Sequence, residues 1–442
     1  MEKRSYLKEF TNYTFLSVLG TLGVSCYILA DTFFISKGLG ANGLTALNLA
    51  IPVYNFIYGT GLMLGMGAAT RFSVCKSRGR QDEINRLYSN TIFISLIFSF
   101  IYMLLGVFFS KDIASLLGAD TSVLELTNTY LYWLMLFAPA FILNNVFLCF
   151  VRNDGSPHLA MAAMLIGSFS NIILDYVFIF PMNMGIFGAI FATGLSPIIS
   201  ILIMLPHWIK KKNTFHFIWT SLRFYIFKQD VALGFPSLVS QVSGGIVMIV
   251  FNMIILGLAG NTGIAAYGVV ANISLVIIAI YTGIGQGIQP LISTFYGKGE
   301  KYMARNMLNY AMITMLILSF VIYTCIYLFA DPITSVFNSE NNMALQEIAV
   351  TGLKIYFIAS PFIGYNIILS TFFTSVERAI PAYVLSLLRG FILIIPFAFL
   401  LSALWSMTGV WMTYPVAEFL TTVIGVILYE RIKRKEIVHL EI

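Results

Sequence analysis

The chain has 442 residues, of which 58% are hydrophobic and only 10% are charged, and its mean hydropathy is +0.86. This composition excludes a soluble globular protein and indicates a polytopic membrane protein. The formal net charge of +6 therefore bears on topology and on anionic lipid headgroups, and we expect membrane lipids but no nucleic acid among the partners.

Twelve apolar stretches are long enough to cross a bilayer as helices. In chain order they are 13–36, 43–70, 87–109, 127–151, 158–181, 186–207, 230–256, 264–293, 303–329, 346–373, 380–401 and 407–430. We therefore predict an all-α membrane protein with twelve transmembrane helices.

The distribution of basic residues predicts the orientation of these helices. Of the 26 lysines and arginines, 22 fall in the two termini or in loops on the same side as the termini. Only Lys37 and Lys111 lie in the opposite loops. Because cytoplasmic loops carry the excess of basic residues, we predict a multi-pass protein of the cell membrane with both termini in the cytoplasm. The charged start and the long first apolar run do not resemble a cleavable signal peptide.

The two halves of the chain repeat each other at a shift of about 220 residues. Gly40 then aligns with Gly260, and the turn at Gly79 aligns with the turn at Gly299. Each half holds six expected helices, so corresponding helices cross in the same direction. We predict an N-terminal lobe (1–220) and a C-terminal lobe (221–442), related by a pseudo-twofold axis along the membrane normal. This arrangement is typical of transporters that work by alternating access.

Two carboxylates, Asp31 and Asp175, lie inside apolar stretches. An ionisable side chain within a bilayer costs several kcal/mol, on the order of 3 or more, so it usually faces a cavity and handles an ion or a substrate. Asn171 precedes Asp175 by four residues and therefore shares its helix face.

Several motifs together resemble the multidrug and toxic compound extrusion (MATE) family of transporters, in particular the bacterial branch of MepA- and DinF-type exporters. They are the twofold repeat of six helices, Ala30-Asp31-Thr32, the glycine-rich second helix, the run RNDGSP at 152–157, and the run from Asn171 to Asp175. The resemblance implies a monomer that is not an enzyme and needs no cofactor. It implies export of bulky, often cationic organic compounds in exchange for inward H⁺ or Na⁺.

The ion site of the N-terminal lobe in this family maps onto Asp31, Asn171, Asp175 and Thr193. Counted at 1.5 Å per residue from the helix ends, Asp31, Asp175 and Thr193 lie at similar depth. A close pair of carboxylates shares a proton readily, and with amide and hydroxyl oxygens it also suits a hard cation. The alternative is a hydrogen-bonded pair that only joins the first, fifth and sixth helices.

The C-terminal lobe departs from relatives that hold sodium through acids in the seventh and tenth helices. Here the seventh span is expected to carry no acid, and the tenth offers Lys354. Arg389 and Glu418 also lie near the middle of their spans. We expect a Lys/Arg–Glu ion pair that stabilises this lobe, with a second coupling site as the alternative.

Polar side chains within the spans are candidates for lining a substrate cavity, because polar groups in a bilayer need partners. They are Asn48, Asn55, Tyr58, Asn145, Gln241, Asn252, Asn272 and Gln286. Hydrogen bonding between helices is the alternative for each of them. The many methionines and aromatic residues permit the binding of varied organic cations.

Three rival functions fit the sequence less well. A flippase for lipid-linked precursors would line its cavity with cations, whereas the N-terminal spans carry acids. A membrane-embedded enzyme needs a convergent catalytic set, but all four histidines fall at span ends or in loops. A channel is disfavoured by the two-lobe repeat without a pore motif.

Overall fold

The computed structural model describes residues 2–338 and 341–438, and all regular structure in that range is helical. The α-helices are α1 Glu2–Ser77, α2 Gln81–Leu116, α3 Leu124–Leu136, α4 Ala138–Asn153, α5 Pro157–Ile179, α6 Gly185–Met204, α7 Pro206–Ile209, α8 Phe224–Gly297, α9 Lys301–Phe337, α10 Met343–Tyr356, α11 Ser360–Ser375, α12 Ala379–Leu387 and α13 Ile394–Val438. A 3₁₀ turn, Phe357–Ala359, joins α10 to α11, and a π-helix, Leu388–Ile392, joins α12 to α13.

The described residues form eight helical segments that are long and apolar enough to cross a membrane. A ninth is added if α3 and α4, which meet at a bend of 47°, are taken as one span. This is the helical, membrane-spanning architecture that the hydropathy of the sequence predicts.

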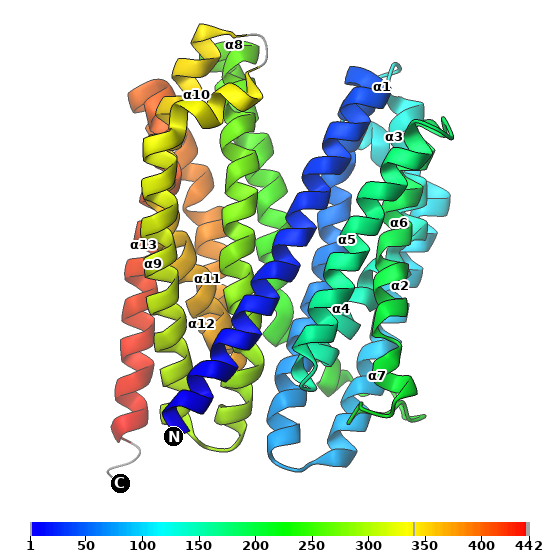
Figure 1. Ribbon diagram of the computed structural model, residues 1–442, viewed down its shortest axis with the longest axis vertical. Coiled ribbons are helices and arrows are strands. Elements are labelled where there is room, and N and C mark those ends of the chain that lie inside the picture. The colour runs from blue at the N-terminus through cyan, green and yellow to red at the C-terminus, as the bar shows by residue number, and fades with distance from the viewer. Residues whose placement is uncertain (1, 339–340, 439–442) are drawn as a thin grey trace.

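Figure 1 shows two helical bundles, one holding α2–α7 and the other α8–α13. Each bundle has a hydrophobic core of its own. Helix α1 starts at the end of the molecule where both termini lie, which we call the terminal end. There Phe10 is buried in the core of the α8–α13 bundle, and from there α1 runs diagonally to the other bundle (Figure 1). The first helix thus crosses from one bundle to the other.

The longest helices change direction at glycines. Gly40 in α1 has φ 65° and ψ −159°, and Gly260 in α8 has φ 60° and ψ −155°. Gly79 and Gly299, which end the turns after α1 and α8, also have positive φ values of 70° and 82°. Side chains with a Cβ rarely adopt this conformation. The glycines that align in sequence therefore take the same backbone conformation in both halves.

The two bundles contact each other most closely where α1 passes α8. A Cβ at Gly67 would overlap the backbone carbonyl of Asp230, and one at Gly234 would overlap the carbonyl of Met63. Glycine at both positions lets the two backbones touch, as small residues do at helix contacts in membranes. The bundles thus meet backbone to backbone toward the terminal end.

Polar side chains add to this contact between the bundles. Asn153 at the end of α4 donates to the Gln289 side chain in α8 at 2.9 Å, and Gln289 donates to Thr70 in α1 at 3.2 Å. The Arg78 side chain donates to the carbonyl oxygen of Gly297 at 3.2 Å. These interactions also lie toward the terminal end.

The segment between the bundles, residues 213–223, is hydrogen-bonded to α2. The backbone N–H groups of His216, Ile218 and Arg223 each donate, at 2.8 Å, to a side-chain oxygen of α2. The three acceptors are Asn85, Ser89 and Asn90. This extended segment is therefore held to the first bundle up to the residue before α8.

Replacing Gly234 with alanine should destabilise the closed contact between the bundles, because the added methyl group overlaps the Met63 carbonyl. Overpacking of this kind costs about 1–3 kcal/mol. The measurement is thermal unfolding of the purified protein in detergent. Gly244 is the matched control, since an added Cβ there meets nothing within 4 Å. Equal unfolding temperatures of the two alanine variants would contradict this account of the contact.

Candidate ion-coupling site

The two intramembrane acids of the first half face each other. Asp31 of α1 is 6% exposed and Asp175 of α5 is fully buried, and their carboxyl groups are within hydrogen-bonding reach. One oxygen of each carboxyl group, Oδ1, is buried without a hydrogen-bond partner. Two buried carboxylates at this separation need a shared proton or a bound cation between them.

Asn171 and Thr193 complete the group of four residues. With its amide oriented to satisfy both neighbours, Asn171 donates to Asp175 Oδ2 at 3.0 Å and accepts from the backbone N–H of Thr193 at 3.3 Å. The Thr193 hydroxyl donates to the Ala189 carbonyl at 3.1 Å, one turn earlier in α6. The structure therefore brings together all four residues that the sequence singles out, on helices α1, α5 and α6.

Tyrosines lie near the acids: Tyr27 and Tyr130 are buried, and Tyr54 and Tyr58 are half-buried. Of the four, only Tyr58 is among the cavity candidates that the sequence suggests. The hydroxyl groups of Tyr27 and Tyr54 are 2.7 Å apart, and Tyr54 stacks on Tyr58 with ring centroids 5.6 Å apart. Tyr130 of α3 is 3% exposed and lies close to Thr193 and to both acids. The sequence offers only a general indication of these tyrosines: any tyrosine hydroxyl buried in an apolar segment needs a polar partner.

A cavity of about 390 Å³, open in part to solvent, lies about one helical turn from this site. Its lining includes Tyr27, which precedes Asp31 by one helical turn, and Tyr58. It also includes Asn144 and Ser200, whose Oδ1 and Oγ atoms lack hydrogen-bond partners. The cavity therefore offers aromatic faces and unsatisfied polar atoms beside the acid pair.

The other cavity candidates have different surroundings. Tyr58 lines the cavity, whereas Asn145 donates to the Phe141 and Tyr58 carbonyl groups, which is the interhelical alternative. Asn55 and Gln241 lie where α1 meets α8, next to Gly245 and Gly59. The remaining four do not line this cavity: Asn48 is exposed, Gln286 is buried, and Asn252 and Asn272 are half-buried.

The second half contains the expected ion pair, but without the lysine. Both Nε and Nη2 of Arg389 donate to Glu418 Oε1, at 3.1 and 2.9 Å, and Asn366 donates to Oε2 at 2.7 Å. Arg389 projects from the π-helix between α12 and α13. Lys354 lies elsewhere, 5.1 Å from the ring centroid of Tyr327. The ion pair is therefore between arginine and glutamate alone.

The expectation that the seventh span carries no acid is wrong. Asp230 at the start of α8 is fully buried, accepts from Arg71 of α1 at 3.3 Å, and accepts from Thr91 of α2 at 3.3 Å. The sequence gives little warning, because Asp230 is the first residue of the expected span and its partner is 159 residues away. This pair joins the two bundles beside Gly67.

Another buried carboxylate, Asp154, lies in the loop after α4. Asp154 accepts from Lys76 at 2.5 Å, from His207 at 2.9 Å and from the backbone N–H of Thr214 at 2.8 Å. Burial alone would raise the pKa of Asp154, but these hydrogen bonds outweigh burial and hold its pKa below the usual value. The carboxylate therefore ties the end of α1, the loop after α4, α7 and the segment before α8 together.

Known proteins resemble the chain along most of its length. The multidrug export protein MepA of Staphylococcus saprophyticus is 26% identical over 424 residues, which cover 94% of this chain and 92% of that protein. MepA of Staphylococcus aureus is 24% identical over 434 residues, covering 97% and 94%.

Solved structures share the fold. A mutant of the Vibrio cholerae MATE transporter VcmN matches with a TM-score of 0.90 at 21% identity, covering 98% of each chain. A MOP superfamily transporter from Pyrococcus furiosus, described as having a binding pocket of reverse polarity, matches with a TM-score of 0.89 at 23% identity, covering 96% and 95%. The family profile described as MatE matches residues 17–177 and 236–400. This chain therefore belongs to the MATE family of transporters.

Proposed function

We propose that the protein is a multidrug efflux antiporter, which exports bulky and often cationic organic compounds in exchange for inward H⁺ or Na⁺. The observation that carries this proposal is the Asp31–Asp175 pair, buried with unsatisfied oxygens beside an aromatic cavity. The cations Arg71, Arg389 and Lys76 are paired with other acids, so none of these three neutralises Asp31 or Asp175. The names of the MepA relatives support the same function.

The proposed topology has twelve membrane crossings in two lobes, 1–220 and 221–442, related by a pseudo-twofold axis along the membrane normal. Helices α1, α8 and α13 each contain a break with non-helical backbone angles, at Gly40, Gly260 and Ser406. If α1, α8 and the segment Ala379–Arg434, which contains the α13 break, each cross twice, the nine candidate segments become twelve. The distribution of lysine and arginine supports a cytoplasmic location for both termini.

In the proposed cycle, the acid pair alternates between two states. It either binds the coupling ion, or it is negatively charged and favours a cationic substrate in the adjoining cavity. Loading the pair with H⁺ or Na⁺ removes negative charge beside the cavity, and the substrate then leaves. The close contacts near Gly67 and Gly234 are at the terminal end, so this conformation corresponds to one that is closed toward the cytoplasm. Opening to the cytoplasm would separate α1 from α8 at these contacts.

The alternative is a flippase for a lipid-linked precursor. Such a substrate carries phosphates, which require cationic ligands in the cavity. The lining of the cavity beside Asp31 includes no lysine or arginine among the described residues. One buried cation, Arg152, contacts Met164 of this lining at 3.6 Å. A pyrophosphate needs several basic ligands, so the lining favours the export of cations.

The test is transport of tetraphenylphosphonium by the full chain in proteoliposomes, with a pH gradient or a sodium gradient imposed separately. Accumulation driven by one gradient identifies the coupling ion. A tenfold gradient of the coupling ion is worth about 1.4 kcal/mol, so one-for-one exchange should support about a tenfold accumulation of this monovalent cation. Absence of accumulation with either gradient, for this cation and for ethidium, would count against the exporter and favour the flippase.

A further inference from the structure

The segment between the bundles, residues 213–223, and the start of α8 present large apolar side chains on the outside of the protein. Trp219 is 87% exposed and Leu222 is 54% exposed, and in the first turn of α8 Phe224 and Tyr225 are 76% and 66% exposed. A cluster of this size on a protein surface marks a place of contact with a membrane or another protein. The proposed transport cycle gives this surface no role.

The segment lies beside the lipid-facing side of α2. The rings of Phe217 and Trp219 contact the ring of Phe93, with centroids 5.4 and 6.0 Å apart. Leu96 and Phe100, three and seven residues after Phe93, share its helix face and are 46% and 60% exposed. Exposed apolar side chains along a membrane-spanning helix face lipid. Trp219 therefore extends the lipid-facing surface of α2 toward the terminal end.

The backbone of the segment is satisfied in a way that permits contact with lipid. A chain without regular structure carries N–H groups that need partners before it can lie at the edge of a bilayer. The N–H groups of His216, Ile218 and Arg223 donate to side chains of α2. The last acceptor, Asn90, is about 14 Å along α2 from its first residue, and the apolar stretch of α2 begins at 87. The segment therefore lies at the level where α2 enters the membrane.

Cations accompany these apolar side chains, and the surrounding sequence holds no acid. Residues 206–229 contain five lysines and arginines but no aspartate or glutamate. In the described part of the chain, none of the five forms an ion pair. All five side chains are exposed: Lys210, Lys211, Lys212, Arg223 and Lys228. The surface is therefore both apolar and positively charged.

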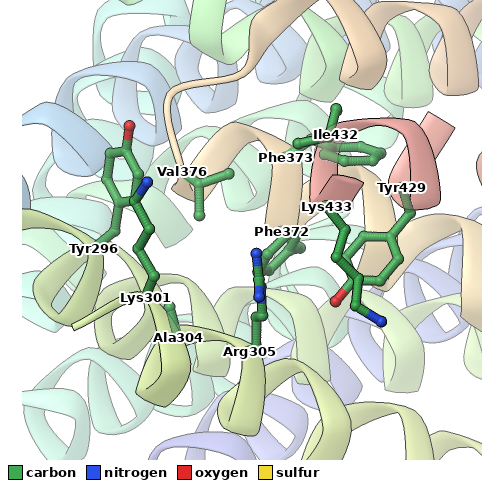
Figure 2. A pocket seen from close by; sticks show the side chains of 10 residues that line it. All are labelled: Tyr296, Lys301, Ala304, Arg305, Phe372, Phe373, Val376, Tyr429, Ile432 and Lys433. Atoms are coloured by element: carbon green, nitrogen blue, oxygen red, sulfur yellow. The ribbon is translucent and has the colours of Figure 1, made fainter. Parts of the chain in front are cut away.

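Other charged side chains at the terminal end are already engaged. Lys301 and Arg305, which line the recess shown in Figure 2, each interact with other groups of the protein. Of the two acids in the first turn of α2, Glu83 pairs with Arg80, whereas Asp82 is exposed. At the start of α2 and along the segment, five exposed cations thus outweigh one exposed and unpaired acid. Anionic groups outside the protein can reach these cations.

We propose that residues 209–228 form a membrane-binding surface, and that its partner is the cytoplasmic leaflet with its anionic phospholipids. Trp219, Leu222 and Phe224 lie among the glycerol groups and the first carbons of the acyl chains, where tryptophan is enriched in membrane proteins. The cations lie at the level of the headgroups and attract anionic lipids. This assignment takes the terminal end as cytoplasmic, as in the proposed topology. The segment then lies in the membrane interface and not free in the cytoplasm.

The test measures which lipids lie next to the segment in proteoliposomes of the full chain. In a Cys26→Ser/Cys325→Ser background the other two cysteines are buried, so a bimane label attaches to Trp219→Cys. Quenching is compared between doxyl-labelled phosphatidylglycerol and doxyl-labelled phosphatidylcholine at equal mole fraction. We expect both lipids to quench the label, and phosphatidylglycerol to do so about threefold more strongly. Replacing the five cations with glutamine should lower this ratio to about onefold, while the protein elutes as the same species in size exclusion.

Three further labelled positions complete the experiment. Leu222→Cys keeps Trp219 and should repeat the result. Leu316→Cys, on an exposed part of α9, should be quenched equally by the two lipids, and Lys211→Cys should be quenched by aqueous iodide. If Trp219→Cys and Leu222→Cys respond to iodide and to neither lipid, the surface faces water and the proposal is overturned. Equal quenching of both by the two lipids would overturn the part of anionic headgroups. The measurement does not involve transport, so its result is independent of the proposed function.

Discussion

Asparagine in place of Asp31 or of Asp175 is expected to abolish gradient-driven accumulation of substrate. Asparagine keeps the shape of the side chain but can neither release a proton nor carry charge, so the pair no longer exchanges an ion. Under a tenfold gradient of the coupling ion, accumulation should fall from about tenfold to about onefold. The measurement is tetraphenylphosphonium transport in proteoliposomes under whichever gradient drives the original chain.

Proton release distinguishes a coupling role from a structural one. If H⁺ is the coupling ion, binding of tetraphenylphosphonium to the detergent-solubilised protein in weak buffer should release protons, and neither asparagine variant should do so. Asp112→Asn is the matched control, because that carboxylate is exposed near the end of α2. Accumulation by Asp31→Asn at the level of the control would show that the pair only joins α1 to α5.

Breaking the Arg389–Glu418 pair is expected to have the largest effect on stability. Glu418 is 1% exposed and Arg389 is 13% exposed, so Arg389→Gln leaves a buried carboxylate with only the Asn366 amide as a partner. Removing one partner of a buried ion pair costs about 3–5 kcal/mol. Thermal or denaturant unfolding in detergent measures this loss. Arg80→Gln breaks an exposed pair with Glu83 and should cost at most about 1 kcal/mol.

The double variant Arg389→Met/Glu418→Met decides between the two roles of the pair. Replacement of both charges by apolar side chains of similar volume is often neutral for stability. If the pair only stabilises the second half, the double variant should unfold near the temperature of the original chain and transport with the same coupling. A folded double variant that has lost coupling would instead assign ion coupling to this pair.

The grouping of Asp31 with Asp175 is the feature of the candidate site that is most accessible from the sequence. Carboxylates in apolar stretches are costly, so Asp31 and Asp175 stood out, and counting residues along helices placed them at one depth. The repeat likewise aligned Gly40 with Gly260, and these two glycines have nearly equal backbone angles. Both predictions rest on local periodicity and helix length, which a single sequence carries.

Contacts between residues that are far apart in the sequence cannot be predicted in the same way. Asp230 contacts Arg71, and Asp154 contacts His207, only because of how the helices pack. No local pattern encodes a partner 53 or 159 residues away. Tyr130 was missed for a related reason, since a tyrosine in an apolar segment has the same pattern whether its hydroxyl supports a site or faces lipid.

The attachment of residues 213–223 to α2 and to Asp154 has a consequence for how the halves can move. A flexible linker would let the second half translate as well as rotate relative to the first half. Here the chain has almost no free length before Phe224, and Asp230 in the second turn of α8 also binds Arg71 and Thr91. Rotation of the second half must therefore begin within the first turns at the start of α8. Lengthening the chain at that junction should therefore disturb the relative motion of the halves more than an insertion of equal length at the exposed tip near Lys211.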